Sequence, residues 1–461
     1  MENKEKNYIS NDRDVAETEH HSHSSHHHHS HHSHGHHHRH HSSHKSSNNR
    51  KKQNRKEKIE RFIRRNKKYI VYCVVAIAVF ICMVFVGGYL DRIDRVGHQG
   101  ESVGEDYQGE KNSASHLNID IPFFDEDVVI VNPAVEAFMK ADGSLSVKDV
   151  YDMYSSYANR LDVGVPVELS YEISEVPSGY NVKKAEIIIA DNKSLSNPSV
   201  YTLKDYETKL YVYNLKTGTR YYYRINLTFA NETETSVGGS FMTAEGPRIM
   251  NVDGVYNMRD IGGWKTASGK VIKQGLLYRG CEIDGSIEPK YTITDSGINT
   301  MLKELGIKTD MDLRAESDNI YGTDALGAAV NHKYYGTQMY SQIFENKKSN
   351  ESIRKVFSDL ADKKNYPIYL HCTYGQDRTG TVCYLLEALL GVSKENMMKE
   401  YLLSGFHYGD VYGGHEPMEE FIEKLSKLPG VSMSEKVEGY LLSIGVTEDE
   451  ISSIRKIFLA D

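Results

Sequence analysis

Apolar and polar positions follow three different patterns along this chain of 461 residues. Positions 69–90 are uncharged and mostly apolar without a break. From about residue 165, apolar and polar residues alternate with a period of two, which is typical of half-buried strands. From residue 249 onward, strand-like and helix-like segments alternate, which indicates a layered α/β fold. The sequence therefore predicts a membrane-spanning helix, a β domain and an α/β domain.

The uncharged stretch Tyr69–Leu90 is 22 residues long. A helix rises about 1.5 Å per residue, so this length suffices for the roughly 30 Å hydrocarbon core of a bilayer. Residues 50–68 contain eleven basic and two acidic residues, whereas residues 91–111 contain three basic and six acidic ones. The positive-inside rule then predicts a single-pass signal anchor, with the N-terminus in the cytoplasm and the C-terminal body outside the cell membrane. A cleaved signal peptide and a buried core helix are the alternatives, and the long charged segment before the stretch disfavours both.

Residues 1–68, on the N-terminal side of this stretch, hold most of the histidines. Sixteen of the 22 histidines lie within residues 20–44, and no periodic apolar pattern accompanies them. We expect this cytoplasmic segment to be disordered. Imidazole is a ligand for Zn²⁺, Ni²⁺ and Cu²⁺, so metal binding by the His-rich tail is one hypothesis and a low-complexity tail without a selected role is the other. Residues 91–117 are polar and are predicted to form a stalk.

The region 118–246 is predicted to form an all-β sandwich. A short helix is expected at Val147–Tyr157. Strands are expected at 167–173, 185–190, 208–215, 220–229 and 238–244. Gly246-Pro247 marks the link to the next domain.

One turn in this region carries a resemblance to a known family. The run Leu215–Ile225 resembles the corner before the sixth strand of fibronectin type III domains, and Ser240–Ala244 resembles the last strand of that fold. The resemblance implies that the Tyr221 hydroxyl bonds back to the backbone. It also implies either a binding module or a rigid spacer.

Residues 247–461 are predicted to form the α/β domain. Strands are expected at 307–313 and 366–371, and helices at 297–305, 352–361, 379–390 and 394–404. Within it, an apolar strand ends at Cys372, five residues separate that cysteine from Arg378, and an amphipathic helix follows. A loop of this kind directs backbone N–H groups at one spot at the positive end of a helix, which makes an anion cradle. Arg378 adds a planar fork that can hold two phosphate oxygens.

A cysteine at the floor of such a cradle is stabilised as the thiolate, which is a nucleophile for phosphoryl transfer. The full stretch His371-Cys-Thr-Tyr-Gly-Gln-Asp-Arg-Thr-Gly380 resembles the signature loop of the cysteine-based protein tyrosine phosphatases. Upstream, Asn257–Gly263, Gly275–Arg279 and Met311–Arg314 with Glu316 resemble further motifs of one bacterial subgroup, which includes phosphoinositide-active members. The resemblance covers roughly residues 249–410.

This resemblance implies a role for each residue of the loop. Cys372 is the expected nucleophile, Arg378 the phosphate-binding residue and Asp377 the general acid, with Asp312 in reserve because no Trp-Pro-Asp sequence is present. Asp377 as a mere cap of the following helix is the alternative. The expected substrate-binding residues are His371, Thr373, Tyr374, Gly375, Gln376, Thr379 and Gly380. The expected supporting residues are Arg259, Asp260, Asp312 and Arg314.

Charge and composition limit the classes of partner and substrate that the sequence predicts. Residues 1–68 carry a net charge of +8 and the whole chain −9, so residues 69–461 carry −17. An acidic body argues against nucleic acid as a partner. Phosphoinositide-active relatives tend to carry lysines inside the loop, where this chain has Thr373 and Gln376. Both facts favour phosphotyrosine.

The sequence thus predicts a membrane-anchored bacterial protein tyrosine phosphatase that acts on a phosphorylated protein or peptide and requires neither metal nor cofactor. One alternative is a phosphoinositide or inositol phosphate phosphatase. The other is a non-catalytic surface binding or adhesion protein, which the intact Cys372, Asp377 and Arg378 disfavour.

Overall fold

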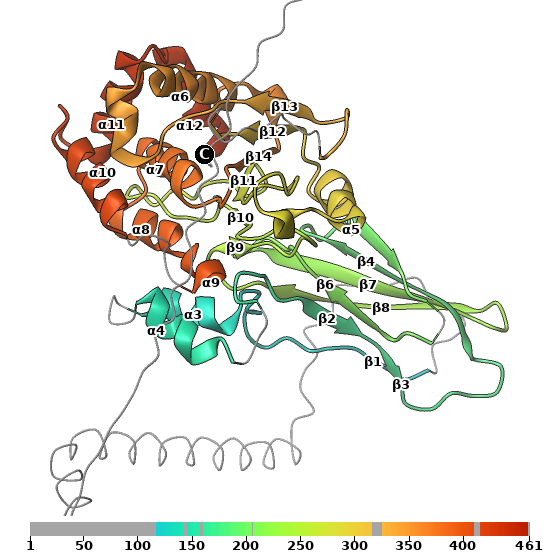
Figure 1. Cartoon of the computed structure of the whole chain (residues 1–461). Helices are drawn as coiled ribbons and strands as arrows, with labels where there is room; N and C mark the ends of the chain where they lie inside the picture. The colour runs from blue at the N-terminus through green and yellow to red at the C-terminus, as the bar shows by residue number, and fades with distance from the viewer. Residues whose placement is uncertain are drawn as a thin grey trace, which may run out of the picture. The chain divides into compact units, whose positions relative to one another are not determined.

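The computed structural model describes residues 117–141, 146–156, 160–204, 206–315, 325–409 and 415–459 (Figure 1). The predicted tail (1–68) and membrane span (69–90) lie outside the described residues, and so does the predicted stalk (91–117) except for its last residue. Within the described ranges, no helix has both the length and the apolar character that crossing a membrane requires.

The C-terminal part is built on a six-stranded mixed sheet. The strand order is β13-β12-β14-β11-β10-β9, with parallel pairing from β13 to β11 and antiparallel pairing on both sides of β10. The strands are β9 (Arg248–Ile249), β10 (Arg259–Asp260), β11 (Leu277–Gly280), β12 (Thr309–Asp312), β13 (Asn331–Tyr334) and β14 (Ile368–His371). The predicted strands at 307–313 and 366–371 are β12 and β14, so the α/β layer prediction is confirmed for this part.

Helices and short helical turns pack around this sheet (Figure 1). They are η1 (Pro289–Tyr291), α5 (Asp295–Asn299), η2 (Thr300–Glu304), η4 (Tyr340–Glu345), α6 (Lys347–Leu360), η5 (Lys363–Asn365), α7 (Asp377–Leu390), α8 (Lys394–Leu402), α9 (Gly405–Tyr408), α10 (Glu416–Ser426), α11 (Met433–Ser443) and α12 (Glu448–Phe458). Helix α7 is buried from Thr379 to its end because α8 and α11 pack against it. A helix that is apolar on most sides is expected at such a central position.

The strand register brings three strand ends to one edge of the sheet. Gly280 of β11 and Asp312 of β12 both lie opposite His371 of β14. The residues that follow these parallel strands therefore emerge side by side at the carboxyl edge, where α/β sheets commonly hold their ligands.

The described residues of the N-terminal part form three small antiparallel sheets around a second core. The strand orders are β5-β4-β7-β8, β2-β6 and β1-β3. The strands are β1 (Ile119–Asp120), β2 (Val167–Ser170), β3 (Glu172–Ile173), β4 (Val182–Ala190), β5 (Ser199–Thr202), β6 (Lys209–Val212), β7 (Arg220–Phe229) and β8 (Glu234–Met242). Tyr221 at the start of β7 is buried, and its hydroxyl accepts a hydrogen bond from the Lys216 N–H at 2.9 Å. Assignment of this region to the fibronectin type III fold stays a prediction.

Two helices of the N-terminal part belong to the larger core. Helices α3 (Pro133–Lys140) and α4 (Val147–Tyr154) precede the second β-strand. Their buried side chains join the apolar core of the C-terminal part, and Phe138 contacts Phe406 with 5.7 Å between ring centroids. Helices α3 and α4 therefore pack with the α/β part although they precede residue 246 in the chain, and the division at that residue stays a prediction.

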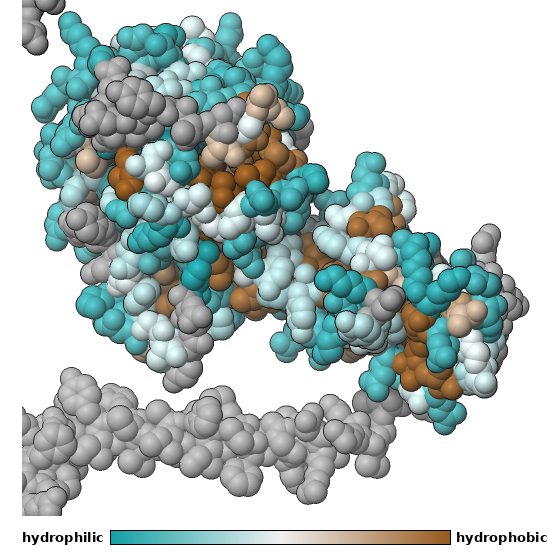
Figure 2. Space-filling model, turned by 45° about the vertical axis from the view of Figure 1, so that its right-hand side comes forward, coloured by the Kyte–Doolittle hydropathy of each residue, from teal (hydrophilic) through white to brown (hydrophobic). Residues whose placement is uncertain are grey.

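The surface drawn in Figure 2 is mixed rather than uniformly apolar. Apolar side chains reach it in separate areas between hydrophilic ones. Val176 and Tyr206 of the β region are among the exposed large apolar residues. An open groove in the β region is lined by residues of β1, β2, β3, β4 and β6 and of neighbouring loops, none of which belongs to the α/β part. This groove is thus separate from the Cys372 loop.

Candidate active site

The Cys372 loop lies at the carboxyl edge of the sheet. It begins where β14 ends at His371 and finishes where α7 begins at Asp377. Cys372 is 3% exposed and is not in a disulfide. Strand, loop and helix therefore meet at this cysteine as the sequence pattern predicts.

Three successive carbonyl groups of the loop accept hydrogen bonds from outside it. The bonds run from Glu282 N–H to Thr373 O (3.0 Å), from Asn257 Nδ2 (3.1 Å) and the Tyr408 hydroxyl (2.5 Å) to Tyr374 O, and from Arg279 Nη2 to Gly375 O (2.5 Å). In a trans peptide the C=O and the following N–H point in opposite directions. The N–H groups of residues 374 to 376 therefore point into the loop, which is the arrangement that binds an anion.

Gly375 is required at its position by both conformation and space. Its φ of +67° lies in the left-handed region, which side chains disfavour. A Cβ atom there would lie 2.2 Å from Gly280 O. The loop can close against the end of β11 only because this residue has no side chain.

A buried cluster of oppositely charged residues holds the far end of the loop. Glu400 of α8 bonds Arg259 Nε through Oε1 and Arg279 Nη1 through Oε2, each at 2.6 Å, and all three side chains are at most 2% exposed. Burial alone would raise the pKa of Glu400, but the two guanidinium groups outweigh it and lower that pKa. Burial, with the charge of Glu400 nearby, raises the pKa of Glu387 well above its ordinary value. We call Arg259, Arg279, Glu400 and Glu387 the basic cluster, since two arginines face one ionised carboxylate.

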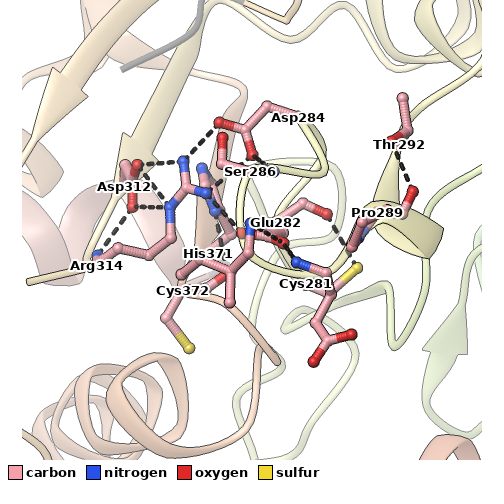
Figure 3. Close-up of polar contacts among 12 residues, drawn as sticks. Cys281, Glu282, Asp284, Ser286, Pro289, Thr292, Asp312, Arg314, His371 and Cys372 are labelled. Carbon is pink, nitrogen blue, oxygen red and sulfur yellow. Dashed lines mark hydrogen bonds and ion pairs between the residues drawn. The ribbon is translucent and has the colours of Figure 1, made fainter. Parts of the chain in front are cut away.

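A second buried cluster lies at the ends of β11 and β12 (Figure 3). The Arg314 guanidinium bonds three carboxylates: Asp312 at 2.7 Å, Glu282 at 2.6 Å and Asp284 at 2.8 Å. All four side chains are at most 3% exposed. We call these four residues the acidic cluster. Both Asp312 oxygens contact Arg314, so Asp312 supports the edge of the site and is poorly placed to act as an acid.

Asp377 stands in the first turn of α7, beside the loop. It is half-buried, and its Oδ1 accepts a hydrogen bond from the Tyr340 hydroxyl at 2.5 Å. Burial raises the pKa of Asp377 and outweighs the lowering effects of Tyr340 and Arg378. The helix start and Arg378 would by themselves favour the ionised form, so the raised pKa suits a group that must hold a proton.

The other predicted site residues lie in the Cys372 loop and in the first turn of α7. Arg378 is half-buried in the first turn of α7, and Gln376 and Thr379 are fully buried. Among the described residues, no hydrogen-bond partner of the Thr379 hydroxyl is found, so it can donate to a neighbouring sulfur. A Cβ on Gly380 would lie 3.0 Å from the Tyr401 ring, so glycine permits the close packing of α7 on α8.

His371 lies beneath the loop in a buried row of charged groups. Its Nδ1 lies 3.2 Å from Cys372 O, and its Nε2 lies 3.1 Å from Asp310 Oδ1 without the alignment of a hydrogen bond. Burial lowers the pKa of His371, but the Asp310 and Asp312 carboxylates outweigh it and raise the pKa to about 9. His371 therefore adds positive charge beneath Cys372 at neutral pH.

The other predicted supporting residues act on the scaffold. Arg259 belongs to the basic cluster, and Asp260 pairs with Arg248 at 2.8 Å and accepts the Gly262 N–H. Tyr374 donates its hydroxyl to Glu288 Oε1 at 2.9 Å, and its ring meets the Tyr408 ring edge-on. Tyr374 therefore forms part of an aromatic wall beside the loop.

Some residues of the site were not identified from the sequence. Glu400 and Tyr340 lie far from the loop in the chain and belong to no recognisable motif. Asp162 comes from the N-terminal part, and its Oδ2 accepts the N–H of Asn257, whose side chain in turn holds Tyr374 O. No local sequence pattern distinguishes these residues from their neighbours in the chain. In the described part of the chain, no group of three or more His, Cys, Asp or Glu side chains is placed to hold a metal ion.

Comparison with known proteins agrees with the geometry of this loop. The sequence profile of the tyrosine phosphatase family matches residues 250–460. The matched segment, a little under half of the chain, is thus similar to that family. A tyrosine-protein phosphatase of Nostoc commune is 27% identical over 201 residues, which cover 33% of this chain and 67% of that protein. Across three curated relatives, the matched region covers between 55% and 67% of the relative.

Two solved structures are weakly similar. The core catalytic domain of the PP-IP phosphatase SIW14 from S. cerevisiae, in complex with citrate, covers 34% of this chain and 94% of its own, at 15% identity and a TM-score of 0.22. A second structure of the Siw14 catalytic core covers 34% and 90%, at 17% identity and a TM-score of 0.24. Similarities at this level carry no conclusion about the substrate of this chain.

Proposed function

We propose that this chain is a membrane-anchored phosphatase that hydrolyses phosphotyrosine on proteins through a phosphocysteine on Cys372. The observation that carries the proposal is the outward bonding of Thr373 O, Tyr374 O and Gly375 O, which turns the loop N–H groups toward the space in front of Cys372. Arg378 and Asp377 stand in the adjoining turn of α7.

In the first step, the Cys372 thiolate attacks phosphorus. The sulfur–phosphorus bond forms and the bond from phosphorus to the phenol oxygen breaks. Asp377 gives its proton to that oxygen, so the leaving group departs as a neutral phenol. The loop N–H groups and Arg378 stabilise the charge on the three equatorial oxygens.

In the second step, water attacks the phosphocysteine. Asp377, now a carboxylate, takes a proton from that water, the phosphorus–sulfur bond breaks, and inorganic phosphate and the Cys372 thiolate are released. Thr379 donates to the departing sulfur. His371 adds positive charge below the loop.

The charge around the loop supports a monophosphate substrate. Two buried carboxylates of the acidic cluster, Glu282 and Asp284, follow the end of β11, and Glu282 contacts Thr373 through its backbone. A second or third phosphate beside the bound one would meet this negative charge. Tyr374 and its aromatic neighbours offer a surface on which a phenol ring can pack. Neither the buried carboxylates nor the aromatic surface favours an inositol polyphosphate as the substrate.

The test is a substrate panel with the full chain. We expect turnover of phosphotyrosine peptide to exceed that of phosphoinositides and inositol polyphosphates, and Cys372→Ser to abolish turnover of all of them. Cys383→Ser, a second buried cysteine changed in the same way, should keep activity and serves as the control. Activity should also sediment with membranes. Retained turnover by Cys372→Ser would remove the nucleophile assignment, and faster turnover of inositol polyphosphates would favour the alternative substrate class.

A further inference from the structure

Tyr340 reaches the proposed general acid from another part of the chain. It begins η4, 37 residues before Asp377, and it is 7% exposed. Its hydroxyl lies 2.5 Å from Asp377 Oδ1 and 2.7 Å from the Tyr401 hydroxyl. Three elements, η4, α7 and α8, therefore meet at this pair of phenols.

The Tyr340 hydroxyl donates to Asp377 Oδ1, and this bond sets the direction of the bond between the two phenols. A tyrosine hydroxyl has one proton to donate. When the Tyr340 proton is donated to Asp377 Oδ1, the bond between the two phenols must be donated by Tyr401. Asp377 Oδ1 is then occupied as an acceptor, so the acid proton of Asp377 resides on Oδ2.

The backbone of Tyr340 is held in an unfavourable conformation at this place. Its φ is +52°, in the left-handed region that residues with side chains rarely adopt. The Tyr340 N–H donates to Thr381 Oγ1 at 2.8 Å, and Thr381 Oγ1 donates to the carbonyl of Asp377 at 2.8 Å. Backbone and side chain of Tyr340 thus both bind the first turn of α7. Such backbone conformations are concentrated at functional sites.

We propose that Tyr340 is a positioning residue for Asp377, whose Oδ1 it holds so that the proton for the leaving group is kept on Oδ2. The inference rests on the proposed function, because it assumes that Asp377 is the acid. It adds a residue that lies outside the Cys372 loop and that no loop motif contains.

The charged and titratable groups around Asp377 determine the direction in which its pKa should change when Tyr340 is replaced. They are Arg378 on α7, Tyr340 on η4 and Tyr401 on α8. The Tyr340 hydrogen bond lowers the pKa of Asp377, whereas burial raises it. Removing the hydroxyl while keeping the ring should therefore raise the pKa of Asp377 further. Loosening the packing should do the opposite, because water would enter and reduce the effect of burial.

The experiment compares Tyr340→Phe with wild type in pH–rate profiles of kcat/KM. We expect the alkaline limb, above which Asp377 has lost its proton, to move up by about one pH unit. We also expect phenyl phosphate, with its poor leaving group, to slow by about ten-fold, and para-nitrophenyl phosphate much less, because loss of positioning removes part of the 10²–10⁴-fold effect of a general acid.

Tyr401→Phe is the matched control, since it removes a hydroxyl one hydrogen bond farther from Asp377. Its alkaline limb should stay near that of wild type. The role of Tyr340 is wrong if the alkaline limb of Tyr340→Phe stays in place or moves down while Asp377→Asn flattens the alkaline limb. The proposed function still stands in that case. If Asp377→Asn leaves the limb unchanged, the acid is another residue, and both the assignment of Asp377 and the role of Tyr340 are wrong.

Discussion

The two buried ionic clusters beside the Cys372 loop have opposite charge balance. In the basic cluster, Arg259 and Arg279 face Glu400, and burial raises the pKa of Glu387 well above its ordinary value. In the acidic cluster, one guanidinium, Arg314, faces three carboxyl groups. Both clusters are almost fully excluded from water, so their charges are weakly screened.

The clusters also reach different ends of the loop. Arg279 of the basic cluster bonds Gly375 O directly, so its charge lies close to the far end of the anion cradle. Glu282 of the acidic cluster bonds Thr373 O through its backbone N–H, near the beginning. We infer that the basic cluster shapes the loop for one phosphate and that the acidic cluster discourages further phosphates. The first role concerns folding and turnover, and the second concerns substrate choice.

The largest effect is expected from Glu400→Gln. This change leaves two buried guanidinium groups without an ionised partner, and breaking a buried ion pair in this way costs about 3–5 kcal/mol. Thermal unfolding and kcat should both show the loss. Glu387→Gln is the control, because burial raises the pKa of the Glu387 carboxyl well above its ordinary value and the substitution should therefore remove less charge. Equal effects of the two substitutions would show that Glu400 does not carry the charge that holds the arginines.

A smaller effect is expected from Asp284→Asn in the acidic cluster. Removing one negative charge should raise turnover of inositol polyphosphates relative to phosphotyrosine peptide by about three- to ten-fold, with a dependence on salt. The measurement is the ratio of the two kcat/KM values at low and high ionic strength. Asp191→Asn, which breaks an exposed ion pair with Lys216 in the β region, is the matched control. An unchanged ratio in Asp284→Asn would remove the acidic cluster from substrate selection.

The sequence predicted those parts of the site that are local in the chain. The apolar strand before Cys372, the glycines and the helix after Arg378 form one continuous segment, and the structure has β14, the loop and α7 there. Helix α8 was likewise expected at 394–404 and spans Lys394–Leu402. The local period of apolar residues and the positions of turn residues suffice to predict such elements.

Contacts between distant segments could not be predicted in the same way. In the sequence, Glu400 is one of several charged residues of a helix whose pattern is typical of a surface helix. Only the packing of α8 on α7 buries Glu400 against Arg259 and Arg279. Tyr340 lies in a short helical turn without apolar periodicity. Helices α3 and α4 precede the β-strands in the chain, yet they pack against the α/β core. In each case the fold, and not the local pattern, decides the neighbour.

In the proposed mechanism, Cys372 carries the phosphoryl group during turnover. The most direct measurement is rapid acid quenching of the full chain during turnover of para-nitrophenyl phosphate, followed by peptide mass spectrometry. We predict one phosphate on the peptide that contains Cys372, attached to sulfur, and more of it in Asp377→Asn if that residue also serves as base in the second step. Steady turnover with no phosphate on Cys372 in either protein would show that Cys372 is not the nucleophile.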